Sequence, residues 1–423
     1  MAGNALIGQS GGPTAVINQS LVGALESLYT AQKAGLVGKI LGAKHGVRGI
    51  IQHEFTPLDN LPVDLLERVA QTPSSALGST RDKPDEDYCK KIFDSFKQNH
   101  VEFFFYIGGN DSADTARIIS EMAAAEAAGG QKLRVHHIPK TIDNDLRTTD
   151  HCPGYGSAAR FVALAHQGDD ADNRSLKGIK INIIMGRDAG WLTAASVLGR
   201  YDESDGPHLV YLPEVDFSED QFLADVARVY TKFGRCVIAV SEGIRYRAAD
   251  KTSLLAAKII EGAEVDAHGN RQLSGSGALG DYLSHIVKTK LANVLAKGNP
   301  NVSAGKLRVR ADTFGYLQRS FPTIVSESDA YEARQCGRNA VTYALSAPDG
   351  LISGSVAMKR ISAIGESAEP YQIDFFPTPL ATVARQTKHF PVDWITNGNA
   401  LADPFLQYAR PLVGPLPKPG RLI

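Results

Sequence analysis

Residues 139–145 read Pro139-Lys140-Thr141-Ile142-Asp143-Asn144-Asp145 and directly follow His136-His137-Ile138, for which we expect a strand. A second stretch, Tyr106-Ile107-Gly108-Gly109-Asn110-Asp111-Ser112, continues the apolar run 103–107. Each pattern predicts a strand that ends in a loop, since a polar segment or a glycine turn follows it. Together they place a lysine, a threonine and carboxylates near a glycine turn. Phosphoryl transfer requires such groups, which can hold phosphate oxygens, hold a metal ion and accept a proton.

The same order of strand, glycine turn and helix begins the chain. Ala5-Leu6-Ile7-Gly8 is a short apolar run that leads into Gly11-Gly12-Pro13-Thr14, and residues 15–31 carry apolar residues at helical spacing. A helix is also expected over residues 112–128. Further strands are expected over residues 179–185, 209–212, 236–240 and 307–313. Continuous apolar strands that alternate with helices indicate parallel sheets covered on both faces, so the predicted fold class is α/β throughout.

The length of the chain favours two domains. It has 423 residues, 43% of them hydrophobic, whereas single cores stop growing near about 250 to 300 residues. Ligands of open parallel sheets bind beyond the carboxyl ends of the strands, where each glycine turn named above lies, so the motifs can converge on one cleft. The stretch 411–423 carries prolines at 411, 415, 417 and 419, and we expect it to be extended and packed on the surface.

Composition excludes several classes of function. Lys and Arg number 45 and Asp and Glu 46, which gives no overall positive field of the kind that attracts nucleic acid. The four cysteines, Cys89, Cys152, Cys236 and Cys336, are far apart, which argues against a zinc site or a disulfide framework and fits a reducing cytosol. No secretory signal and no run of about 18 apolar residues is evident. We expect a cytoplasmic protein without nucleic-acid or membrane partners.

The first glycine turn resembles an anion-binding loop. In Gly8-Gln9-Ser10-Gly11-Gly12-Pro13, glycines would let backbone N–H groups approach a phosphate at a helix N-terminus. The turn lacks the Gly-x-x-x-x-Gly-Lys spacing of a P-loop, and it does not match the dinucleotide fingerprint. The chain therefore needs another scheme for binding phosphate.

Five stretches occur in an order that carries more information than any one of them. They are Gly11-Gly12, 108–112, 139–145, Met185-Gly186-Arg187 and Gly315-Tyr316-Leu317-Gln318-Arg319. Their order and spacing resemble the motifs of the phosphofructokinase A family and cover most of the chain. The resemblance implies two doubly wound Rossmann-like domains with largely parallel sheets and an active site in the cleft between them. It assigns residues 1–150, with a returning segment 323–400, to a phosphoryl-donor domain, residues 151–322 to a sugar-phosphate domain, and residues 401–423 to a proline-rich tail.

Two positions are similar to the pyrophosphate-dependent branch of that family. Asp111 and Lys140 stand where ATP-using relatives typically carry glycines. A carboxylate at Asp111 would occupy the place of the α-phosphate of ATP and repel it, while Lys140 can neutralise pyrophosphate and the charge that develops in the transition state. The alternative for Asp111 is that it merely caps the helix that begins near Ser112.

The resemblance also implies the catalytic groups. Asp143 corresponds to the base that takes the proton of the sugar 1-hydroxyl, and Asp145 would orient or assist it. Thr141 offers a hydroxyl to the transferring phosphate, and Arg187 offers a guanidinium that can bridge phosphoryl oxygens. Both carboxylates could instead be hydrogen-bond acceptors of an ordinary loop. At Asn110 the family often carries an Asp that helps to hold Mg²⁺, so this ligand is weaker here, although substrate phosphates commonly hold much of the ion.

The sugar phosphate is expected to bind to a second group of residues. Arg310, Tyr316 and Arg319 resemble the 6-phosphate clamp of the family, because two arginines and a hydroxyl suit a dianion. Glu242 is a candidate acceptor for sugar hydroxyls, although an acid at a helix start is the alternative. The other substrate contacts implied by the family motifs are Gly12, Ile142, Met185 and Gly186.

Two further expectations concern the donor and the assembly. Gly78-Ser79-Thr80-Arg81 resembles a family segment near the donor phosphates, so Arg81 is expected to contact pyrophosphate unless the segment is a plain surface loop. In this family one arginine of the clamp reaches in from a neighbouring subunit. A homodimer or homotetramer is therefore implied.

The resemblance implies reversible phosphoryl transfer from pyrophosphate to fructose 6-phosphate, which gives fructose 1,6-bisphosphate and phosphate in glycolysis. A reaction near equilibrium also permits gluconeogenic flux. The alternatives are an ATP-dependent phosphofructokinase, a kinase acting on sedoheptulose 7-phosphate, and, from another class, a non-catalytic regulatory subunit. Such a subunit would be expected to lose the base or the phosphate-binding lysine, whereas Lys140, Asp143 and Arg187 are all present.

Overall fold

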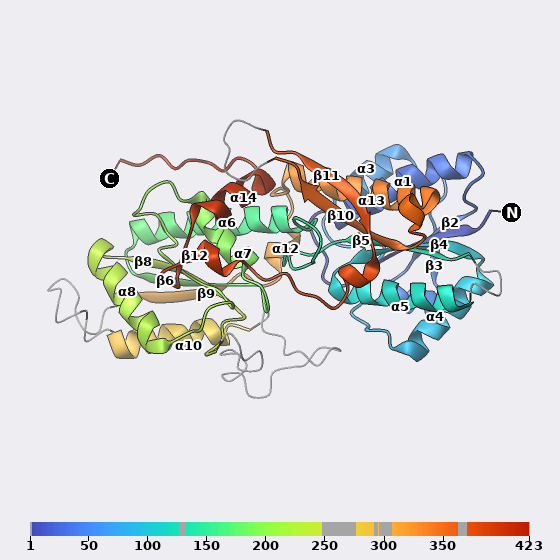
Figure 1. Cartoon of the computed structure of the whole chain (residues 1–423). Helices are drawn as coiled ribbons and strands as arrows, with labels where there is room; N and C mark the ends of the chain where they lie inside the picture. Colours follow the sequence, from blue (N-terminus) through green and yellow to red (C-terminus); the bar gives the residue numbers. More distant parts are fainter. Residues whose placement is uncertain are drawn as a thin grey trace. The chain divides into compact units, whose positions relative to one another are not determined.

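The computed structural model describes residues 2–126, 132–247, 276–291, 295, 307–362 and 370–422. It divides into two compact units (Figure 1). The first unit comprises Met1–Ala158 and Arg319–Lys388, and the second comprises Ala159–Gln318 and His389–Ile423.

The first unit is built on a seven-stranded sheet with the strand order β11-β10-β5-β4-β1-β2-β3. From β10 to β2 neighbouring strands are parallel, whereas β11 and β3 pair antiparallel at the two edges. The strands are β1 (Asn4–Gln9), β2 (Ile40–Ala43), β3 (Phe55–Pro57), β4 (Val101–Gly108), β5 (Arg134–Pro139), β10 (Gly354–Arg360) and β11 (Ile373–Thr378). The largely parallel sheet that the apolar runs predict is therefore confirmed.

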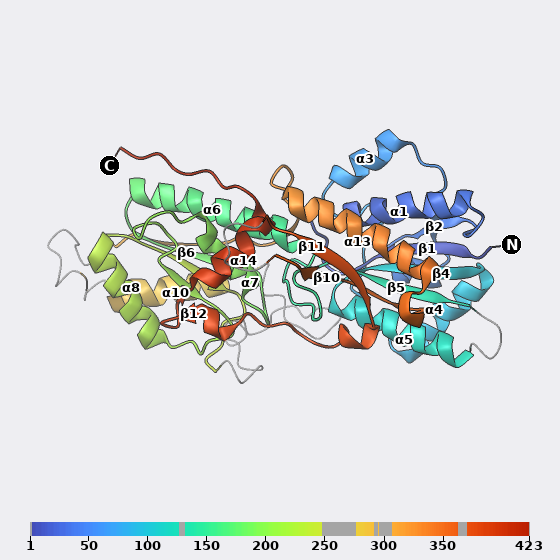
Figure 2. The ribbon, with the colours of Figure 1, turned by 45° about the horizontal axis from the view of Figure 1, so that its top comes forward.

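Helices cover both faces of this sheet, with α1 and α13 on one face and α4 and α5 on the other (Figures 1 and 2). The register of β4 explains why its sequence is a continuous apolar run. Phe103 and Phe105 pack into the core that contains α1 and α13, whereas Phe104 and Tyr106 pack with α4 and α5. Successive strand residues face opposite sides, so both sides must be apolar. The helices are α1 (Ile17–Lys33), α2 (Val47–Ile51), α3 (Val63–Gln71), α4 (Glu86–Gln98), α5 (Asn110–Glu126) and α13 (Glu327–Ser346).

The second unit contains a fully parallel four-stranded sheet with the order β7-β8-β6-β9. Helix α8 shows how its sequence sets local structure. The helix begins after Ser218, whose hydroxyl accepts a hydrogen bond from the Gln221 N–H at 3.4 Å, and it ends at Gly234, which adopts the left-handed conformation. The strands are β6 (Ile179–Ile184), β7 (Leu209–Tyr211), β8 (Cys236–Ser241) and β9 (Val309–Thr313), with a separate pair β12 (Ile395–Thr396) and β13 (Ala400–Leu401). The helices are α7 (Trp191–Ala194), α8 (Glu219–Phe233), α10 (Ala278–Ile286) and α14 (Asp403–Val413), while α6 (Tyr155–Ser175) and α12 (Leu317–Ser320) cross the unit boundaries.

The C-terminal part of the chain differs from the expectation. Residues from His389 onward group with the second unit, although we expected the first domain to extend to residue 400. Pro411 lies inside α14, so a helix extends into the stretch that we expected to be extended. The buried residues Phe405, Tyr408, Ala409, Leu412 and Val413 recur at helical spacing. Burial of this apolar face outweighs the hydrogen bond that proline removes.

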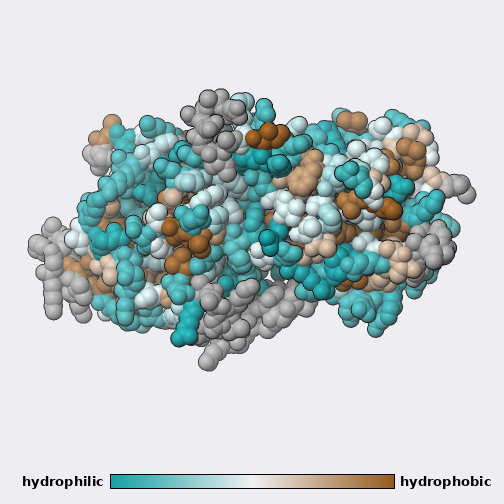
Figure 3. Space-filling view, viewed as in Figure 1, coloured by the Kyte–Doolittle hydropathy of each residue, from teal (hydrophilic) through white to brown (hydrophobic). Residues whose placement is uncertain are grey.

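The surface is mainly hydrophilic on the face shown in Figure 3, where hydrophobic residues form small separate patches. None of the helices among the described residues is long and apolar enough to cross a membrane. All four cysteines are buried and none forms a disulfide.

Candidate active site

Three loops of the first unit begin at the same edge of its sheet. They follow β1, β4 and β5, which are adjacent and parallel, so their carboxyl ends lie together. The Ser10 N–H donates to the Ile107 carbonyl at 2.9 Å, and the Lys140 N–H donates to the Gly108 carbonyl at 2.9 Å. The convergence that the sequence predicts for the glycine turns is therefore confirmed within this unit.

Lys140 lies at the centre of this edge and is only 3% exposed. Its Nζ donates to the Gly12 carbonyl at 2.7 Å, and a Cβ atom on Gly12 would lie 2.9 Å from the Arg319 Nη1. Burial lowers the pKa of Lys140 to about 7; the Arg319 and Arg81 charges lower it further, and Asp143 opposes this shift. Three cations therefore gather beside the first glycine turn, an arrangement that favours the binding of an anion.

The loop after β5 alternates buried and accessible side chains. Ile142 and Asn144 are buried, whereas Thr141, Asp143 and Asp145 are partly exposed. Asn144 adopts a left-handed conformation with φ of +56°, and the Asp143 N–H donates to the Thr141 hydroxyl at 3.1 Å. The loop thus presents one hydroxyl and two carboxylates together. Ile142, by contrast, contributes its side chain to the protein interior and leaves only its backbone for a substrate.

Asn110 lies at the start of α5 beside this loop. Its Nδ2 donates to Asp145 Oδ2 at 2.9 Å, and its Oδ1 is buried without a hydrogen-bond partner among the described residues. An unsatisfied buried amide oxygen next to a carboxylate suits a hard cation that retains part of its water shell. The pair of Asn110 and Asp145 therefore fits a divalent metal, although no group of three or more His, Cys, Asp or Glu side chains is arranged for one in the part of the chain that the structure describes.

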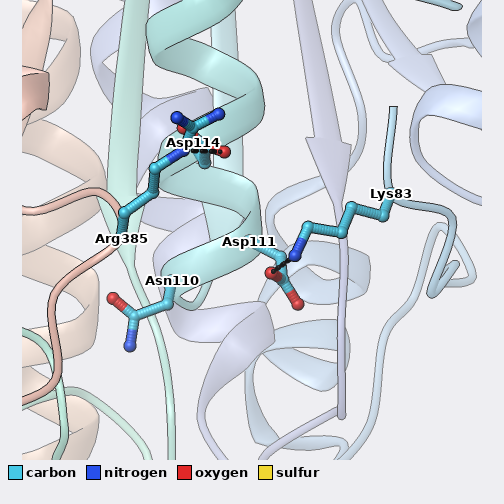
Figure 4. Close-up of a pocket in the computed structure, with 5 residues that line it drawn as sticks. All are labelled: Lys83, Asn110, Asp111, Asp114 and Arg385. Carbon is cyan, nitrogen blue, oxygen red and sulfur yellow. Dashed lines mark hydrogen bonds and ion pairs between the residues drawn. The ribbon is translucent and has the colours of Figure 1, made fainter. Parts of the chain in front are cut away.

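Asp111 lines a pocket of about 400 Å³ that we call the donor pocket (Figure 4). Its lining residues are Lys83, Asn110, Asp111, Asp114 and Arg385. The Lys83 Nζ lies 3.3 Å from Asp111 Oδ1, and both side chains are more than half exposed. Helix α5 begins at Asn110, so Asp111 lies within its first turn and not at the capping position before it. This placement disfavours the capping alternative for Asp111.

The loop 78–81 docks onto the first glycine turn. The Gly11 N–H donates to the Thr80 carbonyl at 2.9 Å, and the Ser79 hydroxyl donates to the Gly11 carbonyl at 2.6 Å. Because Arg81 also lowers the pKa of Lys140, its charge acts on the same edge of the sheet. The interpretation of this segment as a plain surface loop is therefore disfavoured.

Residues of the second unit converge at the carboxyl ends of β6 and β8. The Gly186 N–H points to Glu242 Oε1 at 3.5 Å, and the Ser241 hydroxyl donates to the Gly186 carbonyl at 2.6 Å. A Cβ atom on Gly243 would lie 2.0 Å from the Arg187 carbonyl, so only glycine fits there. The two loops that carry Met185-Gly186-Arg187 and Glu242 are therefore locked together.

The proposed 6-phosphate residues fall in different units. Arg310 lies on β9 and Tyr316 just after it, both exposed, whereas Arg319 belongs to the first unit and lies beside Gly12. Gln318, for which the sequence pattern predicts no role, is buried and joins two of the motifs. It accepts from the Met185 N–H at 3.3 Å and donates to the Gly315 carbonyl at 2.8 Å.

A buried ionic network anchors the segment that follows the Asp143 loop. His151 is 1% exposed and lies between two carboxylates, with Nδ1 at 2.8 Å from Asp150 and Nε2 at 2.6 Å from Glu332 on α13. Although burial alone would lower the pKa of His151, the Glu332 and Asp150 charges raise it to about 9. His151 is therefore protonated at neutral pH, and the network attaches this segment to α13.

We expect this network to make stability depend on pH. A histidine whose pKa rises from 6.5 to about 9 on folding stabilises the protein fully below pH 6.5 and loses that contribution as the pH rises through 9. The loss is up to about 3 kcal/mol. Urea unfolding at pH 7 and pH 10 should show this fall in the unmodified protein and a much smaller one in His151→Gln. The exposed His53→Gln is the control, and an equal fall in both variants would contradict the assignment.

Parallel α/β units with cations and glycine turns at the carboxyl ends of the strands are typical of doubly wound proteins that bind phosphate groups. A family profile described as phosphofructokinase matches residues 4–344. The chain belongs to the phosphofructokinase family.

Relatives agree with this assignment over nearly the whole chain. The chain is 50% identical over 413 residues to pyrophosphate–fructose 6-phosphate 1-phosphotransferase of Rhodospirillum rubrum, with 97% of this chain and 94% of the relative covered. Its fold is similar to crystal structures of pyrophosphate-dependent phosphofructokinases from Marinobacter aquaeolei and Nitrosospira multiformis. The first gives a TM-score of 0.78 at 28% identity and covers 99% of this chain and 93% of that one. The second gives a TM-score of 0.77 at 30% identity and covers 100% of this chain and 94% of that one.

Proposed function

We propose that this enzyme transfers a phosphoryl group reversibly from pyrophosphate to the 1-hydroxyl of fructose 6-phosphate. The products are fructose 1,6-bisphosphate and phosphate, as in glycolysis and, in reverse, gluconeogenesis. The observation that carries the proposal is the placement of Lys140 against the Gly12 carbonyl with Arg319 and Arg81 nearby, while Asp111 lines the adjoining donor pocket. The 50% identity to the Rhodospirillum rubrum enzyme supports the same reaction.

The first unit would bind the donor and carry out proton transfer. Lys140 neutralises pyrophosphate oxygens, Gly12 permits close approach of the anion, and Thr141 donates its hydroxyl to the transferring group. Asp143 accepts the proton of the sugar hydroxyl as the oxygen attacks phosphorus, and Asp145 orients it. Asp111 excludes a third phosphate by charge, since two like charges in a half-exposed site repel each other by about 1 to 4 kcal/mol at 4 Å.

The second unit would bind the sugar phosphate. Glu242 accepts hydrogen bonds from sugar hydroxyls, while Met185 and Gly186 shape its site and Arg187 bridges phosphoryl oxygens. Arg310 and Tyr316, together with Arg319 of the first unit, are proposed to bind the 6-phosphate. An arginine from a second subunit would complete this clamp, so we propose a homodimer or homotetramer. We also propose that the protein is cytoplasmic.

Enzymes of the phosphofructokinase family generally use a divalent metal ion, and we propose Mg²⁺ here. The Asn110 Oδ1 and the Asp145 carboxylate would hold it together with substrate phosphates. When bound, the ion would neutralise charge on the phosphates during transfer.

The test is formation of fructose 1,6-bisphosphate by the purified protein with Mg²⁺ and fructose 6-phosphate, with pyrophosphate and ATP compared at matched concentrations. We expect turnover with pyrophosphate and at least about a hundredfold lower kcat/KM with ATP, the ratio that about 3 kcal/mol of charge discrimination gives. Turnover with ATP alone would overturn the donor assignment. Turnover with neither donor would favour another sugar phosphate or a regulatory subunit.

A further inference from the structure

Four residues far along the chain hold two parts of the candidate active site. The segment Arg385–Lys388 returns to the first unit and contacts both helix α5 and the loop that carries Asp143. No residue of this segment has a role in the proposed chemistry. Its contacts nevertheless form a closed ring with Asn110, Asp114 and Asp145.

The contact to α5 is an ion pair at the donor pocket. Arg385 Nε donates to Asp114 Oδ2 at 2.9 Å, and both residues line the pocket (Figure 4). Asp114 lies one helical turn after Asn110, so a contact that fixes Asp114 also fixes the start of the helix. Asp114 is 8% exposed, and its other oxygen accepts from Arg117 Nε at 3.0 Å.

The contacts to the loop come from Lys388. Its backbone N–H donates to the Asp145 carbonyl at 2.7 Å. Its Nζ donates to the Asp150 carbonyl at 2.8 Å, to the Thr149 carbonyl at 3.2 Å and to Asn144 Oδ1 at 3.5 Å. The Lys388 ammonium group thus joins Asn144, which is next to Asp143, to the backbone of residues 149 and 150 that follow the loop.

Two observations show that these contacts belong to one assembly. Thr387 forms an antiparallel bridge with Leu146, and Gln386 accepts a hydrogen bond from Arg147 at 2.8 Å. A separate apolar cluster joins α5 and the segment after the Asp143 loop to the two residues directly before Arg385, and its buried members are Ala113, Leu146, Cys152, Val383 and Ala384. The ring closes where Asn110 Nδ2 donates to Asp145 Oδ2.

We propose that the segment Arg385–Lys388, which we call the brace, fixes the position of the Asp143 loop relative to the first turn of α5. Lys388 and Arg385 are then positioning residues for phosphoryl transfer. The catalytic part of this inference rests on the proposed function. Phosphoryl transfer has little covalent chemistry for the protein to perform, so its rate depends on positioning. A displacement of about 1 Å can lower the rate about a hundredfold.

The test uses Lys388→Met and Arg385→Met in the full-length protein. Methionine keeps the apolar stem and the backbone N–H of each residue but removes its charge. Lys90→Met and Arg228→Met are the matched controls, because Lys90 and Arg228 are exposed and pair with single carboxylates, Asp87 and Asp225. We expect kcat with pyrophosphate to fall about 10- to 100-fold in Lys388→Met and about 3- to 10-fold in Arg385→Met. The KM for fructose 6-phosphate should stay within about twofold, because the brace does not contact the residues proposed for the sugar.

A second measurement does not depend on activity. Hydrogen exchange of the peptide that covers residues 141–152 should be at least about tenfold faster in Lys388→Met than in Lys90→Met, since the loop loses its shared donor. Unchanged exchange together with unchanged kcat would overturn the proposal. Equal changes of kcat and KM together with a large loss of thermal stability would show that the segment only stabilises the fold, and would overturn its positioning role. If the unmodified protein forms no product while exchange still quickens in Lys388→Met, the proposed function fails and the brace itself is supported.

Discussion

Replacing Asp143 with alanine is expected to lower kcat for pyrophosphate-dependent formation of fructose 1,6-bisphosphate by about 10²- to 10⁴-fold. The reason is that the sugar hydroxyl must lose its proton as it attacks, and Asp143 is the group proposed to accept that proton. This loss corresponds to about 3 to 5 kcal/mol of transition-state stabilisation. Steady-state kinetics with saturating substrates measure the fall directly.

The structure explains why this variant should keep its fold and its affinity for the sugar. Asp143 is only partly buried, and the hydrogen bond from its backbone N–H to the Thr141 hydroxyl is retained in alanine. The residues proposed to bind fructose 6-phosphate are held by other loops, so its dissociation constant from calorimetry should change by less than about threefold. Asp87→Ala removes an exposed carboxylate of α4 and is the control. A kcat for Asp143→Ala within about tenfold of that control would exclude Asp143 as the base.

The sequence predicted the strands whose residues are apolar on both faces. In β1, β4, β5, β6 and β8, burial between two helix layers leaves a continuous apolar run, and the structure contains each of them. The strands β2, β3, β10 and β11 of the first unit were not predicted. β11 lies at the sheet edge and is only partly buried, and β10 contains a short buried apolar run before Lys359 and Arg360.

The candidate site could be predicted only where motifs lie directly after strands. Lys140 and Asp143 follow β5, and the parallel order of the sheet brings their loop next to Gly12. Lys388 and Arg385 carry no such signal, because they reach the site through a tertiary return of the chain more than 200 residues later. The charge environment of Lys140 also depends on Arg319 and Arg81, which no local pattern connects to it.

The double substitution of Asp111 and Lys140 by glycine is expected to reverse the order of the donors. Loss of the Lys140 ammonium should lower kcat/KM for pyrophosphate by at least about 10²- to 10³-fold, the usual effect of deleting one charged group that stabilises the transition state. Loss of the Asp111 carboxylate should raise kcat/KM for ATP by about 10- to 100-fold, because about 1.4 to 2.8 kcal/mol of repulsion disappears, a value within the range of about 1 to 4 kcal/mol for two charges at 4 Å. Both values are measured with fructose 6-phosphate and Mg²⁺. The control is the double variant Asp87→Ala with Lys90→Ala, which removes an exposed acidic and an exposed basic side chain of the same unit.

The residues that line the donor pocket determine how far kcat/KM for ATP rises in the double variant. Without Asp111, the Lys83 ammonium loses its partner at 3.3 Å and becomes available to a third phosphate, which adds to the effect of removing the repulsion. The residues that line the pocket are all charged or amide side chains, so an adenine ring would find no aromatic or aliphatic surface among them. The double variant should therefore use ATP better than the unmodified protein does, without exceeding the pyrophosphate activity of the unmodified protein. If ATP use does not rise, charge at Asp111 does not select the donor; if pyrophosphate use persists, Lys140 is not the cation that binds it.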